Sequence, residues 1–312
     1  MHFADDVLTV DHIFNGKNPM VDSTTFHESY SQSLSKNDFI RLSDFIQSRI
    51  GIKMPLSKIN MVEARLRKRL KELKLTSYTS YCDYLFTKEG IDKELEKFIN
   101  VITTNKTDFF REPDHFEFLI RKTVPDLITA NGSGVKRSLT LWSAACSRGN
   151  EAYTLAIVLS EFARQYPGLT FDFLILATDI STHVLEKAQR AVYSHDEIGP
   201  VSQELRKRYF LRSKDKNSNL VRVVPAIRDK VKFRRLNLMD NDFKMREPMD
   251  IIFCRNVIIY FDKETQNNLI AKLSRYLKEG GYLFMGHSEV LDCHSLPLVS
   301  VAPAVYKKIG RS

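Results

Sequence analysis

Small and polar residues that could bind a ligand follow two apolar runs of strand length. The first loop, residues 142–151, reads WSAACSRGNE, and its small side chains would let a ligand approach the backbone closely. Asp179 ends the second run, where it could accept both hydroxyls of a ribose or cap the helix expected after it. The loop has one glycine, and the chain has no GxxxxGK[ST], which disfavours dinucleotide and P-loop sites. A ribose site without a phosphate cradle favours a nucleoside cofactor, of which S-adenosylmethionine is the common one.

Two later segments carry polar residues where a binding cleft is expected. Asn237 and Leu238 could read an adenine edge through the amide and the adjacent backbone, although an Asn in a turn is often structural. Arg255 and Asn256 interrupt an apolar run at the end of the strand MDIIF. Tyr260 follows four residues after Asn256, and it is either a core aromatic or part of the site.

The segment at residues 103–112 lies between two regions of different pattern and could form a hinge. Clefts are common at such junctions. Arg111 could hold a carboxylate with its planar guanidinium, or it could pair on the surface with Glu112 or Asp114.

Alternation of strand and helix patterns begins at about residue 135 and predicts an α/β domain with a mainly parallel sheet. The expected strands are LTLWSAA, FLILATD, MDIIFCRN and GGYLFMG, and the expected helices span 150–165, 181–191 and 263–277. Residues 304–309 predict a last strand, antiparallel at or near an edge. Open parallel sheets bind ligands at the carboxyl ends of their strands, so the polar residues above are expected to meet there.

Between residues 205 and 237 this rhythm breaks into the short runs RYFLRS, LVRVVP and KVKFRRLN. They predict a small antiparallel insertion, a hairpin or a three-stranded subdomain, at about 205–235.

The region before the α/β domain predicts a small helical domain over residues 36–100, with no chemistry of its own. Ser35 and Asp38 resemble a capping box at its first helix. Further helices are expected from near residue 57, over 77–86 and over 93–100. Residues 1–35 carry five acidic residues and one Lys, and they predict a flexible acidic tail with one short element near 7–14.

Composition and charge limit the classes of function. A chain of 312 residues is long enough for two domains, and its formal charge of +9 favours an anionic partner. Residues 58–74 contain seven basic and two acidic residues, so this helix presents either a solvated face or a docking face. Four cysteines without a CxxC pair disfavour a zinc site and a disulfide scaffold. The absence of a long apolar run and of a secretory signal pattern favours a cytoplasmic protein without membrane insertion.

Several segments together resemble the chemotaxis receptor glutamate methyltransferases, the CheR family. They are MVEARLRKRL, TNKTDFFRE, LWSAACSRGNEAYTLA, LATDISTHVLEKA, RYFLR, FRRLNL, IIFCRNVIIYF and GGYLFMGHSE. Their order and spacing over about residues 36–309 make the resemblance specific. It implies an N-terminal helical domain, a Rossmann-like class I methyltransferase sheet and a small antiparallel β-subdomain. The domains expected are a tail at 1–35, helices at 36–100, a linker with the first cofactor-side segment at 101–134, and the methyltransferase domain at 135–312.

The resemblance also implies an activity. It is the transfer of a methyl group from S-adenosylmethionine to glutamate side chains of chemoreceptors, giving methyl esters and S-adenosylhomocysteine without a metal. The positions that match the family's cofactor-binding residues are Asn105, Thr107, Arg111, Glu151, Asp179, Asn237, Leu238, Arg255 and Asn256. Arg111 and Tyr260 match the positions that orient the substrate.

The implied partner is the helical bundle of a chemoreceptor's cytoplasmic part, with this protein a monomer recruited from the cytoplasm to receptor arrays. Arg65, Arg67 and Lys68 on the basic helix are expected to meet that bundle through charge. Nucleic acid is not an expected partner, because no [DN]PP[YF] motif and no stripe of aromatic residues accompanies the basic residues.

The first loop departs from the family pattern. Arg148, Asn150 and Ala152 stand where the family has a small hydroxyl, an acid and a proline, so cofactor binding is expected to survive in weakened form. These changes keep a non-catalytic module that binds cofactor or receptor as an alternative. The loop at 213–219 lacks the glycines of members that dock on a receptor's C-terminal peptide, which disfavours such docking here. A methyl acceptor outside chemotaxis also stays open.

Overall fold

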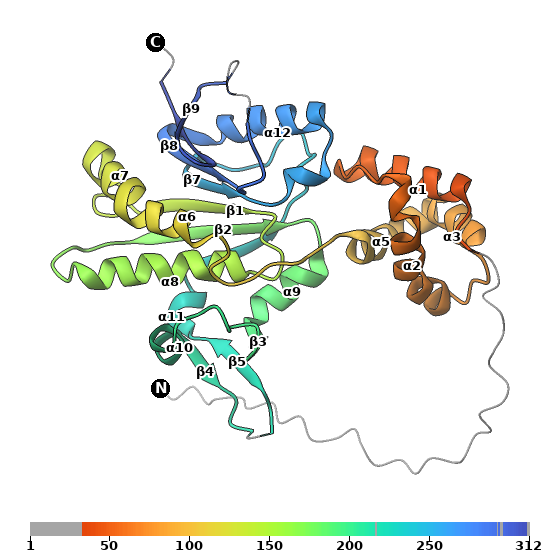
Figure 1. The fold of residues 1–312 in the computed structure, drawn as a ribbon, viewed down its shortest axis with the longest axis horizontal. Helices are drawn as coiled ribbons and strands as arrows, with labels where there is room; N and C mark the ends of the chain where they lie inside the picture. The colour runs from red at the N-terminus through yellow and green to blue at the C-terminus, as the bar shows by residue number, and fades with distance from the viewer. Residues whose placement is uncertain (1–32, 216, 292, 294–295, 311–312) are drawn as a thin grey trace.

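The computed structural model describes residues 33–215, 217–291, 293 and 296–310. A helical unit lies to one side of a sheet-containing unit, and a small β-subdomain projects from the latter (Figure 1). The expected tail, including the short element near residues 7–14, lies outside the described residues apart from its last three. In the described part no helix is both long and apolar enough to cross a membrane.

The helical unit is built from short amphipathic helices that bury one apolar core. They are α1 (Lys36–Ile50), η1 (Leu56–Lys58), α2 (Ile59–Leu73), α3 (Tyr78–Leu85), α4 (Lys88–Lys93) and α5 (Leu95–Ile102). Ser35 is confirmed as the N-cap of α1, since its Oγ accepts a hydrogen bond from the Asp38 backbone N–H at 3.1 Å. The Asp38 carboxylate accepts from the Ser35 hydroxyl, whereas in a capping box it would accept from the Ser35 backbone N–H. Gly51 ends α1 with φ of 76°, a conformation that favours glycine.

The helix expected over residues 93–100 corresponds to α5, whereas α4 before it was not expected. Helix α4 begins where Thr87 Oγ1 accepts from the Gly90 N–H at 3.0 Å. A Cβ on Gly90 would lie 2.0 Å from the Tyr84 carbonyl oxygen, so only glycine fits here. The chain then bends at Glu94, whose buried carboxylate accepts two hydrogen bonds of 2.7 Å from Arg69. Tertiary pairing therefore sets the boundary between α4 and α5.

The larger unit contains a seven-stranded sheet in the order β6-β2-β1-β7-β8-β10-β9. Its strands are β1 (Leu139–Ala144), β2 (Phe173–Asp179), β6 (Val231–Arg235), β7 (Met249–Cys254), β8 (Leu277–Met285), β9 (Leu298–Ala302) and β10 (Val305–Lys308). The first five run parallel to one another, and β10 is antiparallel to both β8 and β9. The expectation of a last antiparallel strand near an edge is confirmed, while the edge strand β9 was not predicted.

Helices cover both faces of this sheet (Figure 1). The helices of the larger unit are α6 (Pro113–Phe118), η2 (Leu119–Thr123), α7 (Val124–Asn131), α8 (Asn150–Gln165), α9 (Thr182–Arg190), α10 (Gln203–Tyr209), α11 (Pro225–Arg228), η3 (Ile258–Tyr260) and α12 (Lys263–Arg275). Of these, α10 and α11 lie beside the β-subdomain (Figure 1). Ile251 and Phe253 pack in the core with α8, whereas Ile252 and Cys254 pack in the core with α12. Burial on both faces explains why the central strands are continuously apolar.

The predicted insertion was assigned partly to the wrong strands. Its sheet consists of β3 (Val192–Ser194), β4 (Phe210–Arg212) and β5 (Leu220–Val223) in the order β3-β5-β4. The run KVKFRR is instead β6, which pairs in parallel with β2 from Ile175↔Val231 onward. As a strand at the edge of the main sheet, β6 alternates apolar and basic residues, a pattern that an antiparallel strand shares.

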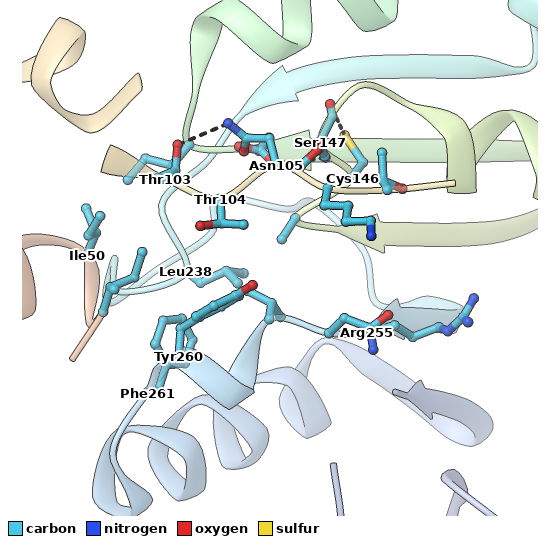
Figure 2. Close-up of a pocket in the computed structure, with 18 of the residues that line it drawn as sticks. Ile50, Thr103, Thr104, Asn105, Cys146, Ser147, Leu238, Arg255, Tyr260 and Phe261 are labelled. Carbon is cyan, nitrogen blue, oxygen red and sulfur yellow. Dashed lines mark hydrogen bonds between the residues drawn. The ribbon is translucent and has the colours of Figure 1, made fainter. Parts of the chain in front are cut away.

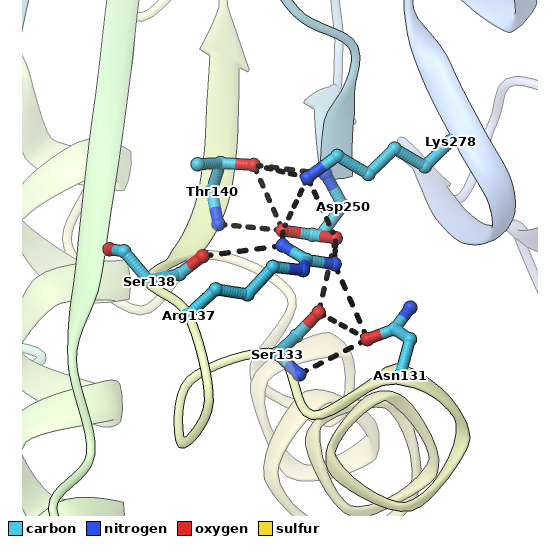
Figure 3. A network of polar contacts seen from close by, with 7 residues as sticks. All are labelled: Asn131, Ser133, Arg137, Ser138, Thr140, Asp250 and Lys278. Atoms are coloured by element: carbon cyan, nitrogen blue, oxygen red, sulfur yellow. Dashed lines mark hydrogen bonds and ion pairs between the residues drawn. The ribbon is translucent and has the colours of Figure 1, made fainter.

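A buried carboxylate ties the amino ends of β1, β7 and β8 to the end of α7 (Figure 3). Asp250 is fully buried and accepts from both terminal nitrogens of Arg137, at 2.6 and 2.8 Å. It also accepts from the Thr140 N–H and hydroxyl at 2.9 Å, and Lys278 Nζ lies 3.2 Å away. Burial opposes ionisation of this carboxyl, but Arg137 and the other donors outweigh it and lower its pKa to about 2.

We expect Asp250→Asn to lower the free energy of unfolding by about 3 kcal/mol at pH 7, because it leaves two cations facing a neutral buried group. Above pH 3.8 the ionised carboxylate contributes fully to wild-type stability, and this contribution is lost as the pH falls toward 2. Urea unfolding at several pH values measures both effects. Asp172→Asn, which removes an exposed partner of Lys230, is the matched control and should cost less than about 1 kcal/mol. Equal costs for the two variants would contradict this account.

Candidate functional site

A pocket opens where the helical unit meets the carboxyl ends of the parallel strands. All ten residues that the resemblance implies for cofactor and substrate line it, namely Asn105, Thr107, Arg111, Glu151, Asp179, Asn237, Leu238, Arg255, Asn256 and Tyr260. Thr104 and Asn105 of the linker lie on one side, and Tyr260 and Phe261 lie opposite (Figure 2). The chain therefore brings five separate segments to one cavity, as expected for an open parallel sheet.

The loop after β1 adopts a strained backbone that turns toward the second strand. Ala145 and Ser147 have φ values of 58° and 50°, which cost of order 1 kcal/mol each in residues other than glycine. The Ser147 N–H donates to Asp179 Oδ2 at 2.9 Å, and its hydroxyl donates to the Asn105 carbonyl at 2.9 Å. These bonds join the ends of β1 and β2 and the linker into one wall.

Asp179 does not cap helix α9, so the capping alternative was wrong. Ser181 is the N-cap, and its hydroxyl accepts from the Val184 N–H. Asp179 Oδ1 accepts from the Ser181 N–H at 2.9 Å, which leaves further lone pairs on both oxygens for a ligand. Burial raises the pKa of this carboxyl above its ordinary value, despite the backbone donors.

Glu151 lies in the first turn of α8 and lines the pocket beside the loop that follows β1. Its Oε1 accepts from the Ser143 hydroxyl at 2.7 Å, and its Oε2 lies 3.3 Å from Arg255 Nη1. Burial raises the pKa of Glu151, with Arg255 acting in the opposite direction. A cationic ligand beside this carboxylate would favour its ionised form.

Arg255 is a structural hub and not a free cation. Its side chain is 2% exposed, and it donates to Glu112 Oε2 at 2.8 Å and to the Arg111 carbonyl at 2.6 Å. Its guanidinium also lies over the rings of Phe116 and Phe253. Arg255 therefore fixes the linker at Arg111 and Glu112 against the end of β7.

Glu289 belongs to this site, although the sequence assigned it no role. It is 3% exposed and accepts from the backbone N–H groups of Gly286, Asn256 and Ile258 at 2.7, 2.8 and 2.9 Å. The Asn256 and Ile258 groups belong to the segment that carries Tyr260, and Asn256 within it has φ of 58°. The acidic residue of the GHSE segment was visible in the sequence, but only the fold shows that it holds the loop after β7.

Asn237 and Leu238 lie on the pocket wall, but the Asn237 amide is already engaged. Its Nδ2 donates to the Arg49 carbonyl at 2.8 Å, and its Oδ1 accepts from the Met239 N–H at 3.0 Å. The structural alternative for this Asn therefore holds for its side chain. Its amide joins α1 to the sheet-containing unit, so any contact with an adenine edge falls to the backbone and Leu238.

Arg148 points away from the pocket. It does not line the cavity, and its guanidinium forms an ion pair with Glu197 of the β-subdomain. Its carbonyl accepts from the Tyr193 hydroxyl at 2.7 Å. The weakening of cofactor binding expected from this long cation thus has no steric basis in the structure.

The three basic residues expected to face a partner diverge. Arg67 and Lys68 are exposed, with side chains 65% and 80% accessible. Arg65 instead donates to the carbonyls of Ile102 and Thr103, where α5 runs into the linker. It stabilises the junction beside the pocket.

One group of side chains resembles a metal site. Potential ligand atoms of Glu112, His115 and His287 lie within 4.8 Å of one another. Both oxygens of Glu112 already accept hydrogen bonds, from Arg255 and Asn256, and the guanidinium charge opposes a cation there. Burial and the charge of Arg255 also lower the pKa of His115 to about 4, so this imidazole is neutral at pH 7.

The donor set fits a nucleoside cofactor that carries positive charge. The buried carboxylate of Asp179 and the partly buried carboxylate of Glu151 face a cavity whose other walls include the apolar side chains of Ile180, Leu236 and Leu238. Such a pocket can accept hydroxyl hydrogens, balance a cation and enclose an aromatic base. The cations at its mouth can attract an anionic substrate.

Comparison with known proteins agrees with this geometry. The model of the CheR methyltransferase all-alpha domain matches residues 37–103, and that of the CheR methyltransferase SAM binding domain matches residues 105–303. A chemotaxis protein methyltransferase of Borreliella burgdorferi is 37% identical over 88% of this chain and 95% of its own length. The Escherichia coli protein of that name is 38% identical over 82% of this chain and 85% of its own. This chain therefore belongs to the CheR methyltransferase family and is an enzyme that uses S-adenosylmethionine.

Proposed function

We propose that this enzyme transfers a methyl group from S-adenosylmethionine to glutamate side chains of chemoreceptors, giving methyl esters in sensory adaptation. The observation that carries the proposal is the meeting of Glu151, Asp179, Arg111 and Tyr260 in one pocket between the two units. The names of the homologous chemotaxis methyltransferases support chemoreceptors as the substrate.

We assign cofactor binding to the inner part of the pocket. S-adenosylmethionine, when bound, supplies a methyl group that its sulfonium has already activated. Asp179 accepts the ribose hydroxyls, and Glu151 balances the positive charge of the cofactor. Leu238 and the Asn237 backbone border the base, while Asn105, Thr107, Arg111, Arg255 and Asn256 complete the walls.

Substrate positioning is assigned to Arg111 and Tyr260 at the mouth. A glutamate carboxylate is ionised at pH 7, since its reference pKa is about 4.3, so no general base is needed. The enzyme has to desolvate this carboxylate and hold it in line with the methyl group, a contribution that can reach about 7–11 kcal/mol. Arg111 is exposed, and its guanidinium has no ion-pair partner in the described part of the chain.

Docking is assigned to the exposed cations of α2, which would meet an acidic receptor bundle. Arg67 and Lys68 carry this role, and Arg65 contributes through the junction it stabilises. We further propose that the enzyme acts as a monomer in the cytoplasm and is recruited to receptor arrays. The domain limits at 36–100, 101–134 and 135–312 form part of this proposal.

The test of the function is methyl transfer from labelled S-adenosylmethionine to purified cytoplasmic fragments of chemoreceptors. The label should be released by base, because a carboxyl ester is base-labile and an N-methyl group is not. Asp179→Ala should abolish the label and weaken S-adenosylhomocysteine binding at least tenfold, as measured by calorimetry. Binding of S-adenosylhomocysteine without transfer to any receptor fragment would favour the non-catalytic alternative. Base-stable label on nucleic acid would favour a nucleic-acid methyltransferase.

We expect Arg111→Ala to lower kcat/KM for the receptor fragment about 100-fold, since the planar guanidinium no longer orients the carboxylate. Tyr260→Phe should cost about tenfold, because only one hydroxyl is lost. Steady-state kinetics at saturating cofactor measure both values, and Arg111→Lys should recover only part of the loss. Full turnover by Arg111→Ala would remove this role.

We expect the double charge reversal Arg67→Glu with Lys68→Glu to raise the KM for the receptor about tenfold at low salt and to flatten its salt dependence. The matched control is Lys88→Glu with Lys97→Glu, which changes the same charge on the exposed faces of α4 and α5. If the two double variants behave alike, the basic face of α2 is merely solvated.

A further inference from the structure

The mouth of the pocket carries cations that the protein itself does not neutralise. Lys53, Lys58, Lys106 and Arg111 line the pocket and are exposed. Within the described residues, no side-chain hydrogen bond or ion pair is formed by any of the four. Some other exposed cations are paired, such as Lys93 with Glu89 at 2.9 Å, and some are not, so what distinguishes these four is that they line one pocket. Among the residues that the structure describes, Asp108 is the only exposed acid that lines the same pocket.

Two of these cations stand outside both the basic helix and the proposed catalytic pair. Lys53 follows α1, and its backbone N–H donates to the Tyr260 carbonyl at 2.8 Å. Lys106 follows Asn105, whose carbonyl accepts from the Ser147 hydroxyl at 2.9 Å. Backbone contacts thus fix one lysine beside the substrate-positioning tyrosine and the other beside the cofactor loop.

The neighbouring acid, Asp262, does not form an ion pair with Lys53. Asp262 accepts from the Thr265 N–H and from Gln47 Nε2, both at 2.8 Å, so its carboxylate caps α12 and holds α1. Lys53 influences Asp262 through its charge without forming an ion pair. An anionic group of a substrate can therefore approach Lys53 at little cost in displaced contacts.

We propose that Lys53 and Lys106 form a specificity surface for carboxylates that neighbour the target glutamate. The preferred substrate is then an acidic amphipathic helix with further glutamates three or four positions from the target, because those positions share one helix face. The inference rests on the proposed function and adds to it the charge pattern of the substrate. A single-stranded nucleic acid fits less well, since none of the described aromatic residues that line the pocket is exposed for base stacking.

The test uses two labelled helical peptides of about 20 residues. Both present one central glutamate, flanked at positions three and four away by Glu in one peptide and by Gln in the other. Fluorescence anisotropy measures their binding to the full chain loaded with S-adenosylhomocysteine, so the readout is independent of turnover. A single-stranded oligonucleotide of similar length is the third ligand. The variants are Lys53→Gln with Lys106→Gln and, as a control of equal charge, Lys122→Gln with Lys187→Gln, which lie outside the pocket lining.

The wild type should bind the Glu-flanked peptide about tenfold more tightly than the Gln-flanked peptide at low salt, which corresponds to about 1.4 kcal/mol. The preference should fall to twofold or less in the Lys53/Lys106 variant, and it should persist in the control. Equal binding of the two peptides by the wild type, or an unchanged preference in the variant, would overturn the proposal. Tighter binding of the oligonucleotide that is lost in the same variant would overturn it as well. A lysine-dependent preference without base-labile methylation would leave this surface in place and contradict the proposed function.

Discussion

The pocket depends on one buried cation. Arg255 leaves the end of β7 and holds the Glu112 carboxylate, the Arg111 carbonyl and Glu151 within hydrogen-bond distance. A buried guanidinium without partners would be strongly destabilising, so the fold has to supply these contacts. The position of the linker, and with it that of Arg111, follows from satisfying this charge.

The same principle explains how the loops around the pocket keep an unfavourable backbone. Ala145, Ser147 and Asn256 have positive φ, and each lies in a loop held by a buried carboxylate. Asp179 accepts from the Ser147 N–H, and Glu289 accepts from the Asn256 N–H. Burial raises the pKa of the Asp179 and Glu289 carboxyls. The geometry of the site is therefore fixed at a cost in the stability of the fold.

Cations in the interior of the protein and cations at the mouth of the pocket differ in whether they are paired. Buried cations such as Arg69 and Arg255 are paired, whereas Lys53, Lys106 and Arg111 at the mouth keep their charge for a ligand. This separation lets one cavity treat two ligands of opposite sign. Carboxylates inside suit a cationic cofactor, and cations outside suit an anionic substrate.

The sequence alone determined the two-unit organisation, the parallel sheet, most element positions and five of the segments that line the pocket. It assigned no chemistry to the helical unit, although residues within 50–61 of that unit also line the pocket. Continuous apolar runs, caps such as Ser35 and short motifs can be recognised in the sequence, because they depend only on residues close to one another in the chain. Tertiary structure decided what depends on distant partners. It placed KVKFRR in the main sheet through pairing with β2, bent the chain at Glu94 through Arg69, and turned Arg148 toward Glu197. It also gave Glu289 its role, because a side chain that binds backbone groups thirty residues away leaves no periodic mark in the sequence.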